Sequence, residues 1–273
     1  MKIKNQLKAS LITFLQKTLA RLTSKPTAVG DWEQLQEIGG GFSGCKSFLV
    51  RRKDSADKYF MKLLDDRDSE RRVRFHRETV IYQTLKVNRI PKVIESNSHL
   101  FEDKSIPLYY VCQFIEGETM DNFIKTKKLT ETDIIKLITD LLEILRQVHQ
   151  QSAAHRDIKP QNIIISPQGV MHLVDFGIAY MDLQETGDFG TERNQELGNR
   201  FLRLSDYAPG SKNKRNPQSD LTLVCGIATY LIGGQAPRVL QDNDGKFPHQ
   251  RKPVADRLKS YQYAGLWNLI FDK

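Results

Sequence analysis

Cysteine is scarce in this sequence. The three cysteines among 273 residues, Cys45, Cys112 and Cys225, lie far apart, and none forms a CxxC pair. This spacing excludes a disulfide scaffold and a cysteine-based zinc site, and it is typical of a reducing compartment. Long hydrophobic runs are also missing, because no stretch approaches the ~18 uninterrupted apolar residues that a membrane span needs. We therefore expect a soluble, cytoplasmic protein.

Charge of both signs is abundant. The chain carries 41 Lys and Arg against 33 Asp and Glu, so its formal net charge is +8, and 39% of its residues are hydrophobic. This composition excludes collagen-like, mucin-like and wholly disordered chains, and the length suits one large domain or two lobes. A net positive charge is compatible with a nucleic acid, an anionic membrane or a polyphosphate as partner. The basic residues are scattered and no nucleic-acid-binding motif occurs, so we expect no nucleic-acid partner.

The first thirty residues form a segment of their own. Apolar residues recur there at helical spacing, which predicts a basic amphipathic helix that Pro26 and Gly30 end. The longest apolar run, residues 11–15, is shorter than the ~7–15 apolar residues of a signal peptide. Residues 5–23 are able to contact a membrane or a partner, or to pack on the protein's own domain. Lys8 lies within the apolar stripe, so we favour the second interpretation.

A glycine cluster precedes two short apolar runs. The runs, residues 48–50 and 59–61, flank a polar turn, as in a β-hairpin. Glycines let a backbone approach a phosphate closely and turn its N–H groups inward. The cluster consists of Gly39, Gly40, Gly41 and Gly44. No helix is predicted to begin there and no GK[ST] follows, which argues against a dinucleotide-binding turn and a Walker loop. We therefore predict a glycine-rich loop between two antiparallel strands.

Two charged residues follow the hairpin in apolar surroundings. Lys62 ends the second predicted strand within the sequence YFMKLL. Glu78 belongs to a charged segment in which Phe75 and Ile81 hold roughly helical positions. A lysine at the end of a strand usually keeps its ammonium group in solvent. Neither residue therefore indicates a function without the motifs that come later in the sequence.

The motifs that decide the function lie in the second half of the chain. Residues 155–162 read HRDIKPQN, and residues 175–177 read DFG. Between them, the apolar runs 163–165 and 171–174 flank the turn SPQG, which predicts a second hairpin. The two motifs, in this order behind a glycine loop and a strand lysine, resemble those of the protein-kinase family. The resemblance covers roughly residues 34–273.

The resemblance implies an α+β protein with the bilobal protein-kinase fold, made of a small β-rich N-lobe and a larger helical C-lobe. We expect an amphipathic extension at residues 1–30, the N-lobe and hinge at 31–116 and the C-lobe at 117–273. The sequence also predicts a long amphipathic helix over 129–150, which leads into the catalytic loop. The final residues, YAGLWNLIFDK, resemble a late helix of the family. The C-lobe is therefore expected to be truncated before its last helix.

The resemblance also implies roles for individual residues in phosphoryl transfer from ATP. Asp157 is expected to accept the proton of the substrate hydroxyl, and Lys159 to steady the γ-phosphate. Lys62 is expected to hold the α- and β-phosphates, paired with Glu78. The residues expected to bind the nucleotide are Gly39, Gly40, Gly41, Gly44, Ser47, Phe60, Lys62, Gln113, Ile115 and Ile164, and those expected to bind Mg²⁺ are Asn162 and Asp175. The form HRDIKPQN is typical of Ser/Thr kinases, so we expect a protein Ser/Thr kinase that also phosphorylates itself.

The resemblance also implies roles for residues around this catalytic site. Cys112 falls at the gatekeeper position beside the hinge, and Asp220 resembles the aspartate that supports the HRD backbone. Arg156 belongs to the arrangement in which many kinases grip a phosphate on the activation segment. The candidate acceptors there are Tyr180, Thr186 and Thr191, and the acids Glu185, Asp188 and Glu192 are an alternative source of negative charge. Whether a threonine is phosphorylated stays open.

The sequence departs from the family pattern at several positions. The glycine loop is one residue longer, which places Ser47 where the family has a valine. Phe60 replaces a small alanine over the adenine, and we expect the smaller Ser47 to make room for its ring. Asn199 stands in place of a threonine, and Asp206 in place of the glutamate that ends the activation segment. An alternative register places that end at residues 208–210.

Two other functions stay open. Phe60 and Asn199 are compatible with a pseudokinase, a scaffold that binds nucleotide without transferring phosphate. A small-molecule kinase is the second alternative, and Lys159 argues against it. The sequence does not identify the protein substrate.

Overall fold

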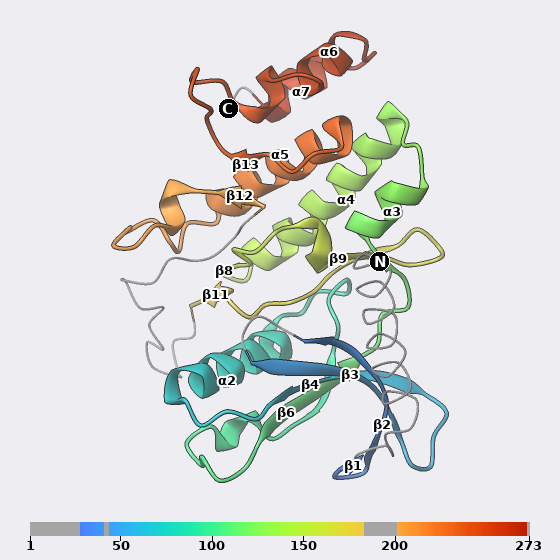
Figure 1. The fold of residues 1–273 in the computed structure, drawn as a ribbon, viewed down its shortest axis with the longest axis vertical. Helices are drawn as coiled ribbons and strands as arrows, with labels where there is room; N and C mark the ends of the chain where they lie inside the picture. Colours follow the sequence, from blue (N-terminus) through green and yellow to red (C-terminus); the bar gives the residue numbers. More distant parts are fainter. Residues whose placement is uncertain (1–27, 41–43, 183–200, 272–273) are drawn as a thin grey trace, which may run out of the picture.

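The computed structural model describes residues 28–40, 44–182 and 201–271. These residues form a sheet-rich lobe, built from the first part of the chain, and a helical lobe built from the rest (Figure 1). The predicted bilobal α+β fold is therefore confirmed. The helix predicted before Pro26 lies outside the described residues, and Ala28 and Val29 already belong to the sheet.

Six antiparallel strands form the sheet of the smaller lobe, in the order β1-β2-β3-β4-β6-β5. They are β1 (Ala28–Val29), β2 (Trp32–Gly40), β3 (Cys45–Arg52), β4 (Lys58–Leu64), β5 (Val93–Ser96) and β6 (Leu108–Gln113). The first predicted hairpin is confirmed as β3 and β4, with Phe48 opposite Met61. Both side chains are buried in a small apolar cluster around Trp32, because residues two apart on a strand share a face of the sheet.

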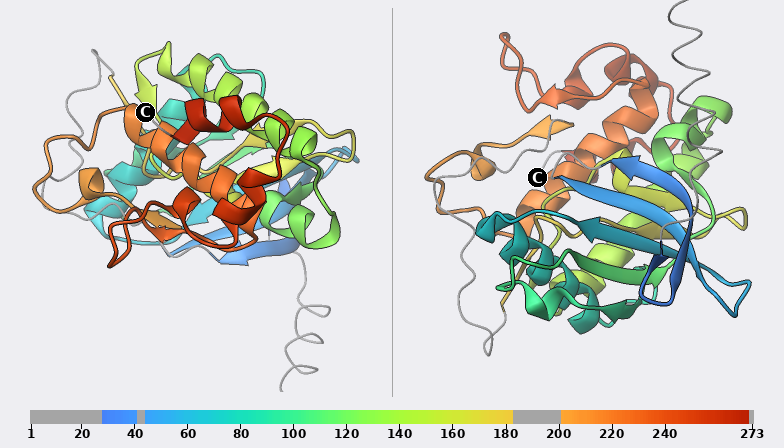
Figure 2. Two further views of the ribbon diagram at one scale, coloured as in Figure 1. Left: turned by 90° about the horizontal axis from the view of Figure 1, so that it is seen from above. Right: turned by 60° about the horizontal axis from the view of Figure 1, so that its bottom comes forward.

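One helix, α2 (Ser69–Thr84), packs beside this sheet (Figure 2). Asp68 caps its first turn by accepting the N–H of Arg71 at 2.9 Å, which satisfies one of the free backbone donors there. Phe75 and Ile81 on its inner face are buried, while charged residues cover its outer side. The helix predicted around Glu78 is therefore confirmed, and its apolar face fixes how it sits on the sheet.

The chain passes to the larger lobe through residues 114–117. Beyond them lie α3 (Met120–Thr126), α4 (Glu131–His149) and α5 (Gln218–Gly233). Thr130 and Asp133 form a reciprocal capping box at the start of α4, and the inner face of α4 is buried along its whole length. The predicted helix over 129–150 is confirmed. α4 and α5 pack side by side as the centre of the lobe (Figure 1).

Short strands and helices complete the larger lobe. They are β7 (Glu118–Thr119), β8 (Ala153–Ala154), β9 (Ile163–Ile165), β10 (Met171–Leu173), β11 (Tyr180–Met181), β12 (Leu202–Arg203), β13 (Arg238–Val239), α6 (Val254–Lys259) and α7 (Ala264–Phe271). The second predicted hairpin is confirmed as β9 and β10, and β7 joins it to make three strands. α7 is held to the start of α4, because Glu131 accepts the N–H groups of Gln262 and Tyr263 and the indole N–H of Trp267 at 2.7–3.0 Å. Among the described helices, none is long and apolar enough to cross a membrane.

Candidate active site

Lys62 lies on β4 with its ammonium group between two carboxylates. Its Nζ is 2.8 Å from Oε1 and 2.9 Å from Oε2 of Glu78 on α2, and 3.4 Å from Oδ1 of Asp175. Tyr110 on β6 donates its hydroxyl to Glu78 Oε1 at 2.8 Å. Although burial opposes the charged form, Glu78 and Asp175 raise the pKa of Lys62 above its ordinary value, so this lysine is a cation at neutral pH. The predicted pair of Lys62 and Glu78 is present, and a carboxylate of the larger lobe meets the same ammonium group.

One buried carboxylate holds the loop that carries the HRD motif. Asp220, in the first turn of α5, accepts the N–H of His155 at 2.8 Å and the N–H of Arg156 at 2.7 Å. Its Oδ2 also lies 2.9 Å from Nε2 of His149 at the end of α4. Arg156 has a φ of +66°, a left-handed conformation that costs a non-glycine residue about 1–2 kcal/mol. The hydrogen bond that the Arg156 N–H donates to Asp220 helps to hold that conformation, so the support predicted for Asp220 is confirmed.

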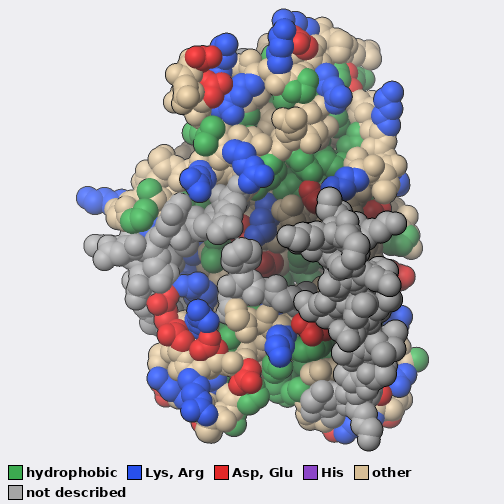
Figure 3. Space-filling view, in the orientation of Figure 1, with side chains coloured by type: hydrophobic (Ala, Val, Ile, Leu, Met, Phe, Trp, Pro, Cys, Tyr) green, Lys and Arg blue, Asp and Glu red, His purple; other side chains and the backbone are tan. Residues whose placement is uncertain are grey.

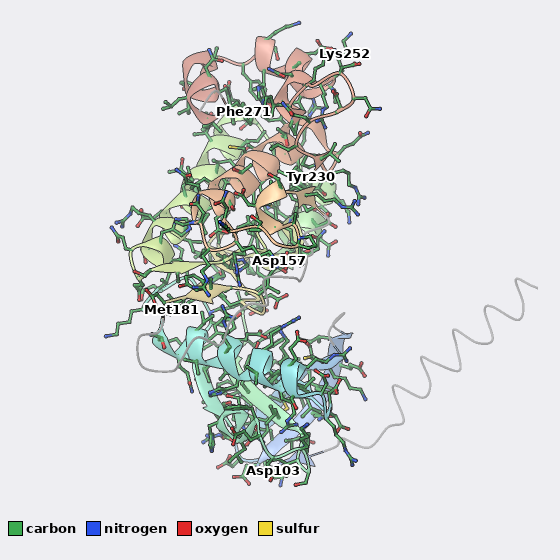
Figure 4. All side chains as sticks on the ribbon, turned by 90° about the vertical axis from the view of Figure 1, so that its left-hand side faces the viewer. Asp103, Asp157, Met181, Tyr230, Lys252 and Phe271 are labelled. Atoms are coloured by element: carbon green, nitrogen blue, oxygen red, sulfur yellow. The ribbon has the colours of Figure 1, made fainter. Side chains whose placement is uncertain are left out.

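Asp157 lies at the end of the larger lobe that faces the sheet (Figure 4). Its Oδ2 accepts hydrogen bonds from Lys159 Nζ at 2.6 Å and from Asn162 Nδ2 at 3.0 Å. Its Oδ1 is buried and has no hydrogen-bond partner among the described residues. Burial raises the pKa of Asp157, and the Lys159 charge opposes that shift. A buried acceptor without a donor is costly, so this oxygen favours a bound molecule that brings an O–H group.

Asp175 stands opposite, at the start of the DFG motif. Its φ is +66°, and its backbone N–H donates to the hydroxyl of Tyr82 on α2 at 2.8 Å. The Lys62 charge lowers the pKa of Asp175, with burial opposing, so the carboxylate is ionised at neutral pH. A Cβ on Gly177 would come within 3.2 Å of Asp175 Oδ1 and 3.3 Å of Glu78 Oε2. The glycine of the motif therefore leaves room for the carboxylates beside Lys62.

The donor set at Asn162 and Asp175 suits a hard cation. Asn162 uses its Nδ2 to donate to the carbonyl of Asp157 at 2.9 Å and to Asp157 Oδ2. This arrangement leaves the amide oxygen of Asn162 as the atom able to bind a metal. Amide and carboxylate oxygens are the ligands that Mg²⁺ prefers in proteins. Within the described part of the chain, no cluster of three or more His, Cys, Asp or Glu forms a separate metal site.

The hinge residues predicted to meet adenine lie where the two lobes join. Gln113 ends β6, and its backbone N–H donates to the carbonyl of Lys92 at 3.0 Å. Ile115 follows in the connecting segment and is half-buried, as is Ile164 on β9. Cys112 is buried against the core, and burial raises the pKa of its thiol to about 12. Gln113, Ile115 and Cys112 thus lie on or next to the connection between the lobes, and Ile164 lies on the three-stranded sheet that begins just after it; their contact with adenine stays a prediction.

The residues predicted to cover the nucleotide lie on β2, β3 and β4. Gly39 and Gly40 end β2 opposite Ser47 and Lys46, and Gly44 precedes β3 with a φ of +74°. Gly41 lies outside the described residues. Phe60 on β4 is half-buried, and its ring centre lies 6.4 Å from that of Tyr110. Its register partner on β3 is Leu49, two residues beyond Ser47, so the expected exchange of size between Ser47 and Phe60 stays a prediction.

Sequence reasoning missed two residues that position this site. Tyr82 contacts the backbone of Asp175, and its ring packs at 5.1 Å against Phe176. Arg72 on α2 is 1% exposed and donates five hydrogen bonds to backbone carbonyls of the segment before β6 and of the loop before α2. An amphipathic pattern assigns an arginine to the solvent face, so the sequence carried no signal for Arg72.

A comparison with known proteins agrees with this geometry. The family model of the protein kinase domain matches residues 32–191, more than half of the chain. The chain belongs to the protein kinase family. "Dual specificity protein kinase zak2" of Dictyostelium discoideum is 30% identical over 218 residues, which are 77% of this chain and 32% of that protein. "Probable serine/threonine-protein kinase YbdM" of Bacillus subtilis is 32% identical over 168 residues, 59% of this chain and 63% of that protein.

A third similar protein is "Probable serine/threonine-protein kinase PknB" of Lactococcus lactis, 33% identical over 130 residues, which are 47% of this chain and 20% of that protein. The chain thus spans less than two thirds of the length of each of these three relatives. The matched region contains the glycine cluster, Lys62, Glu78 and the HRD and DFG motifs.

Two further residues that the sequence singles out, Asp206 and Arg156, have defined contacts in the structure. Asp206, predicted to end the activation segment, accepts a hydrogen bond from Ser219 Oγ at 2.8 Å at the start of α5. Arg156 is 1% exposed, and its guanidinium donates to the carbonyls of Ile178 and Lys214. Its predicted contact with a phosphate stays a prediction. Thr186, Thr191 and Asn199 lie outside the described residues.

Proposed function

We propose that this chain transfers the γ-phosphoryl group of ATP to serine and threonine hydroxyls of protein substrates, its own included. The observation that carries the proposal is the arrangement at Asp157, where one buried carboxylate oxygen has no donor within the described part of the chain and the other accepts hydrogen bonds from Lys159 and Asn162. The lysine two residues after Asp157 and the names of the similar kinases support Ser and Thr as acceptors.

In this proposal Asp157 orients the substrate hydroxyl and takes its proton. Oδ1 is the acceptor, because Oδ2 is already occupied by Lys159 and Asn162. The raised pKa of Asp157 makes its carboxylate a better proton acceptor than a solvent-exposed aspartate. Nζ of Lys159 lies 2.6 Å from Oδ2 of Asp157. Its positive charge is placed there to neutralise negative charge on the transferred phosphoryl group.

Mg²⁺ and ATP fit the residues around this acceptor. We propose that Asp175 and Asn162 hold the ion, since Asp175 is ionised and Asn162 has an amide oxygen to offer. Mg²⁺ bound there would neutralise charge on the phosphate oxygens. Lys62, fixed by Glu78, is proposed to hold the α- and β-phosphates. The backbones of Gln113 and Ile115, the side chains of Ser47, Phe60 and Ile164, and the glycines Gly39, Gly40, Gly41 and Gly44 are proposed to line the rest of the nucleotide site.

We also propose the domain limits and location set out from the sequence, with an N-lobe and hinge at 31–116, a C-lobe at 117–273 and a cytoplasmic site of action. The pairing of β7 with β9 supports the second limit, because the strand directly after residue 117 already belongs to the larger lobe. The three separate free cysteines support a reducing compartment.

The test is a transfer assay with radiolabelled ATP, Mg²⁺ and a Ser/Thr peptide mixture. We expect the parent to label peptide and itself, and Asp157→Asn to lose on the order of 10²–10⁴ in rate. Asp244→Asn is the matched control, because the Asp244 side chain is 77% exposed and remote from the acceptor. A folded parent that binds ATP but labels nothing would refute the proposal and favour the nucleotide-binding scaffold, which the half-buried ring of Phe60 also allows.

A further inference from the structure

Two exposed arginines lie on β12 and β13, two short neighbouring strands of the larger lobe. Arg203 ends β12 and Arg238 begins β13, and these two short strands pair in parallel with Leu202 opposite Arg238. Strands pair about 4.8 Å apart and rise about 3.3 Å per residue, which places the Cα atoms of the two arginines about 6 Å apart. Basic side chains are visible over the position of β12 and β13 in the space-filling view (Figure 3).

The backbone conformation at Arg238 directs its side chain into solvent. In a regular pair, Arg238 would share a face with its register partner Leu202, which is 1% exposed. Instead Arg238 has a φ of +64°, and the N–H of Val239 donates to the carbonyl of Pro237 at 2.7 Å. This is a γ-turn of the rare kind with positive φ, which is strained for a residue with a Cβ. Arg238 is exposed as a result.

Neither guanidinium group has a carboxylate partner among the residues that the structure describes. Within residues 28–40, 44–182 and 201–271, neither Arg203 nor Arg238 has a hydrogen bond or ion pair through its side chain. The two acids closest to the pair in sequence have other partners: Asp242 lies 3.1 Å from Arg251, and Asp206 accepts a hydrogen bond from Ser219. Two guanidinium groups on neighbouring strands concentrate positive charge on this surface, so an anion that contacts both is bound favourably.

The pair lies on strands that pack against α5, the helix whose first turn holds the loop next to Asp157. A Cβ on Gly226 of α5 would come within 3.1 Å of Leu202 and 3.6 Å of Pro237, so both strands pack on α5 at that residue. Asp220, which holds the loop next to Asp157, lies six residues earlier on the same helix, about 9 Å along its axis. An extended peptide that passes along this stretch of α5 covers its 9 Å with about three residues.

We propose that Arg203 and Arg238 form a subsite that binds a carboxylate of the protein substrate, an Asp or Glu within about four residues of the phosphorylated hydroxyl. The inference rests on the proposed kinase function and adds a substrate class to it. Two guanidinium groups present several N–H donors in fixed planes, which suits the two oxygens of a carboxylate. Arg238 occupies a position whose φ of +64° would suit glycine better, so its presence there is consistent with a use for its charge.

The test is a peptide series with one serine, in which a single Glu is moved from position −4 to +4 in a neutral background. With the parent, we expect at least one Glu position to raise kcat/KM about tenfold over the matched Gln peptide. Arg203→Gln and Arg238→Gln should each lower kcat/KM for that Glu peptide about 3- to 10-fold and leave the Gln peptide within twofold. Lys252→Gln, at a side chain 85% exposed on the same lobe, is the control and should change neither.

A second variant separates charge from backbone strain. Arg238→Gly relieves the strained φ, so it should raise the melting temperature while losing the preference for Glu as fully as Arg238→Gln does. A parent that phosphorylates Glu and Gln peptides equally at every position would overturn the subsite and leave the kinase function standing. Equal losses on Glu and Gln peptides in the arginine variants would also overturn it. A parent that phosphorylates no peptide would overturn the proposed function itself.

Discussion

Arg72 should determine how firmly α2 is held on the smaller lobe. Its guanidinium is buried on α2 and bound only through backbone carbonyls in the hydrogen bonds that the structure shows. The acceptors and distances are Asp103 at 2.5 Å, Phe101 at 2.7 Å, Ile106 at 3.0 Å, Asp66 at 3.1 Å and Leu100 at 3.2 Å. Arg72→Met keeps most of the side-chain volume and removes every donor. Because Glu78 lies on the same helix, a looser α2 should also weaken the hold on Lys62.

The size of the effect follows from these contacts. A hydrogen bond with a charged partner contributes about 1.5–3 kcal/mol, and such bonds within one cluster do not add in full. The acceptor residues are exposed or half-buried, so water can replace part of what is lost. We expect Arg72→Met to lower the free energy of unfolding by about 3 kcal/mol. Arg72→Lys retains three donors and should lower it by about half as much.

The assay is urea unfolding followed by tryptophan fluorescence in a Trp267→Phe background, so that only the buried Trp32 of the smaller lobe reports. The Michaelis constant for ATP is measured in parallel and should rise in Arg72→Met. Arg74→Met is the control on the same helix, because Arg74 forms an exposed pair with Glu70 and should cost less than about 1 kcal/mol. Equal stability of the Arg72 and Arg74 variants would refute the reasoning.

Three further predictions follow from the same structure. Lys62→Ala and Glu78→Ala should each reduce transfer, and a double-mutant cycle should show clear coupling, whereas strict additivity would mean that the pair does not act together in solution. Gly117→Ala should lower the melting temperature far more than Gly169→Ala, because a Cβ at Gly117 would overlap the backbone carbonyl of β9 while the one at Gly169 meets open space; equal shifts would contradict this. Burial lowers the pKa of His155, so its contribution to stability is complete above about pH 6.5 and is lost as the pH falls below that value. Urea unfolding should show a decline of at most about 1.4 kcal/mol per pH unit from this group, and His155→Phe should reduce the slope.

The local elements were predictable because their signals lie within short stretches of sequence. The two hairpins follow from apolar runs around polar turns, and α4 follows from apolar residues at helical spacing above a Thr130 cap. The pairing of Lys62 with Glu78 followed from the resemblance to kinases, which supplied a contact that spacing alone left open. Sequence patterns identify such elements because the period of the side chains reflects the geometry of the backbone.

Contacts made by the backbone could not be predicted in the same way. The five acceptors of Arg72 are carbonyl groups, which every residue has, so no residue type marks them. The turn at Arg238 was equally hidden, since glycine is the residue expected at a positive φ. The hydrogen bond from the backbone N–H of Asp175 to the Tyr82 hydroxyl joins residues 93 positions apart. Only the tertiary fold brings these two residues together, so no local sequence pattern predicts the contact.

The hold of Glu131 on the start of α7 has a consequence for the order of folding. Its carboxylate at the beginning of α4 binds N–H groups that lie 131 and 132 residues later in the chain and an indole 136 residues later. Contacts of such wide sequence separation form late, because the entropy of closing a long loop must first be overcome. On the ribosome, α4 and α5 are complete before this contact becomes possible. The larger lobe therefore acquires this closure only after residues 262–267 have been synthesised, later than the two helices at its centre.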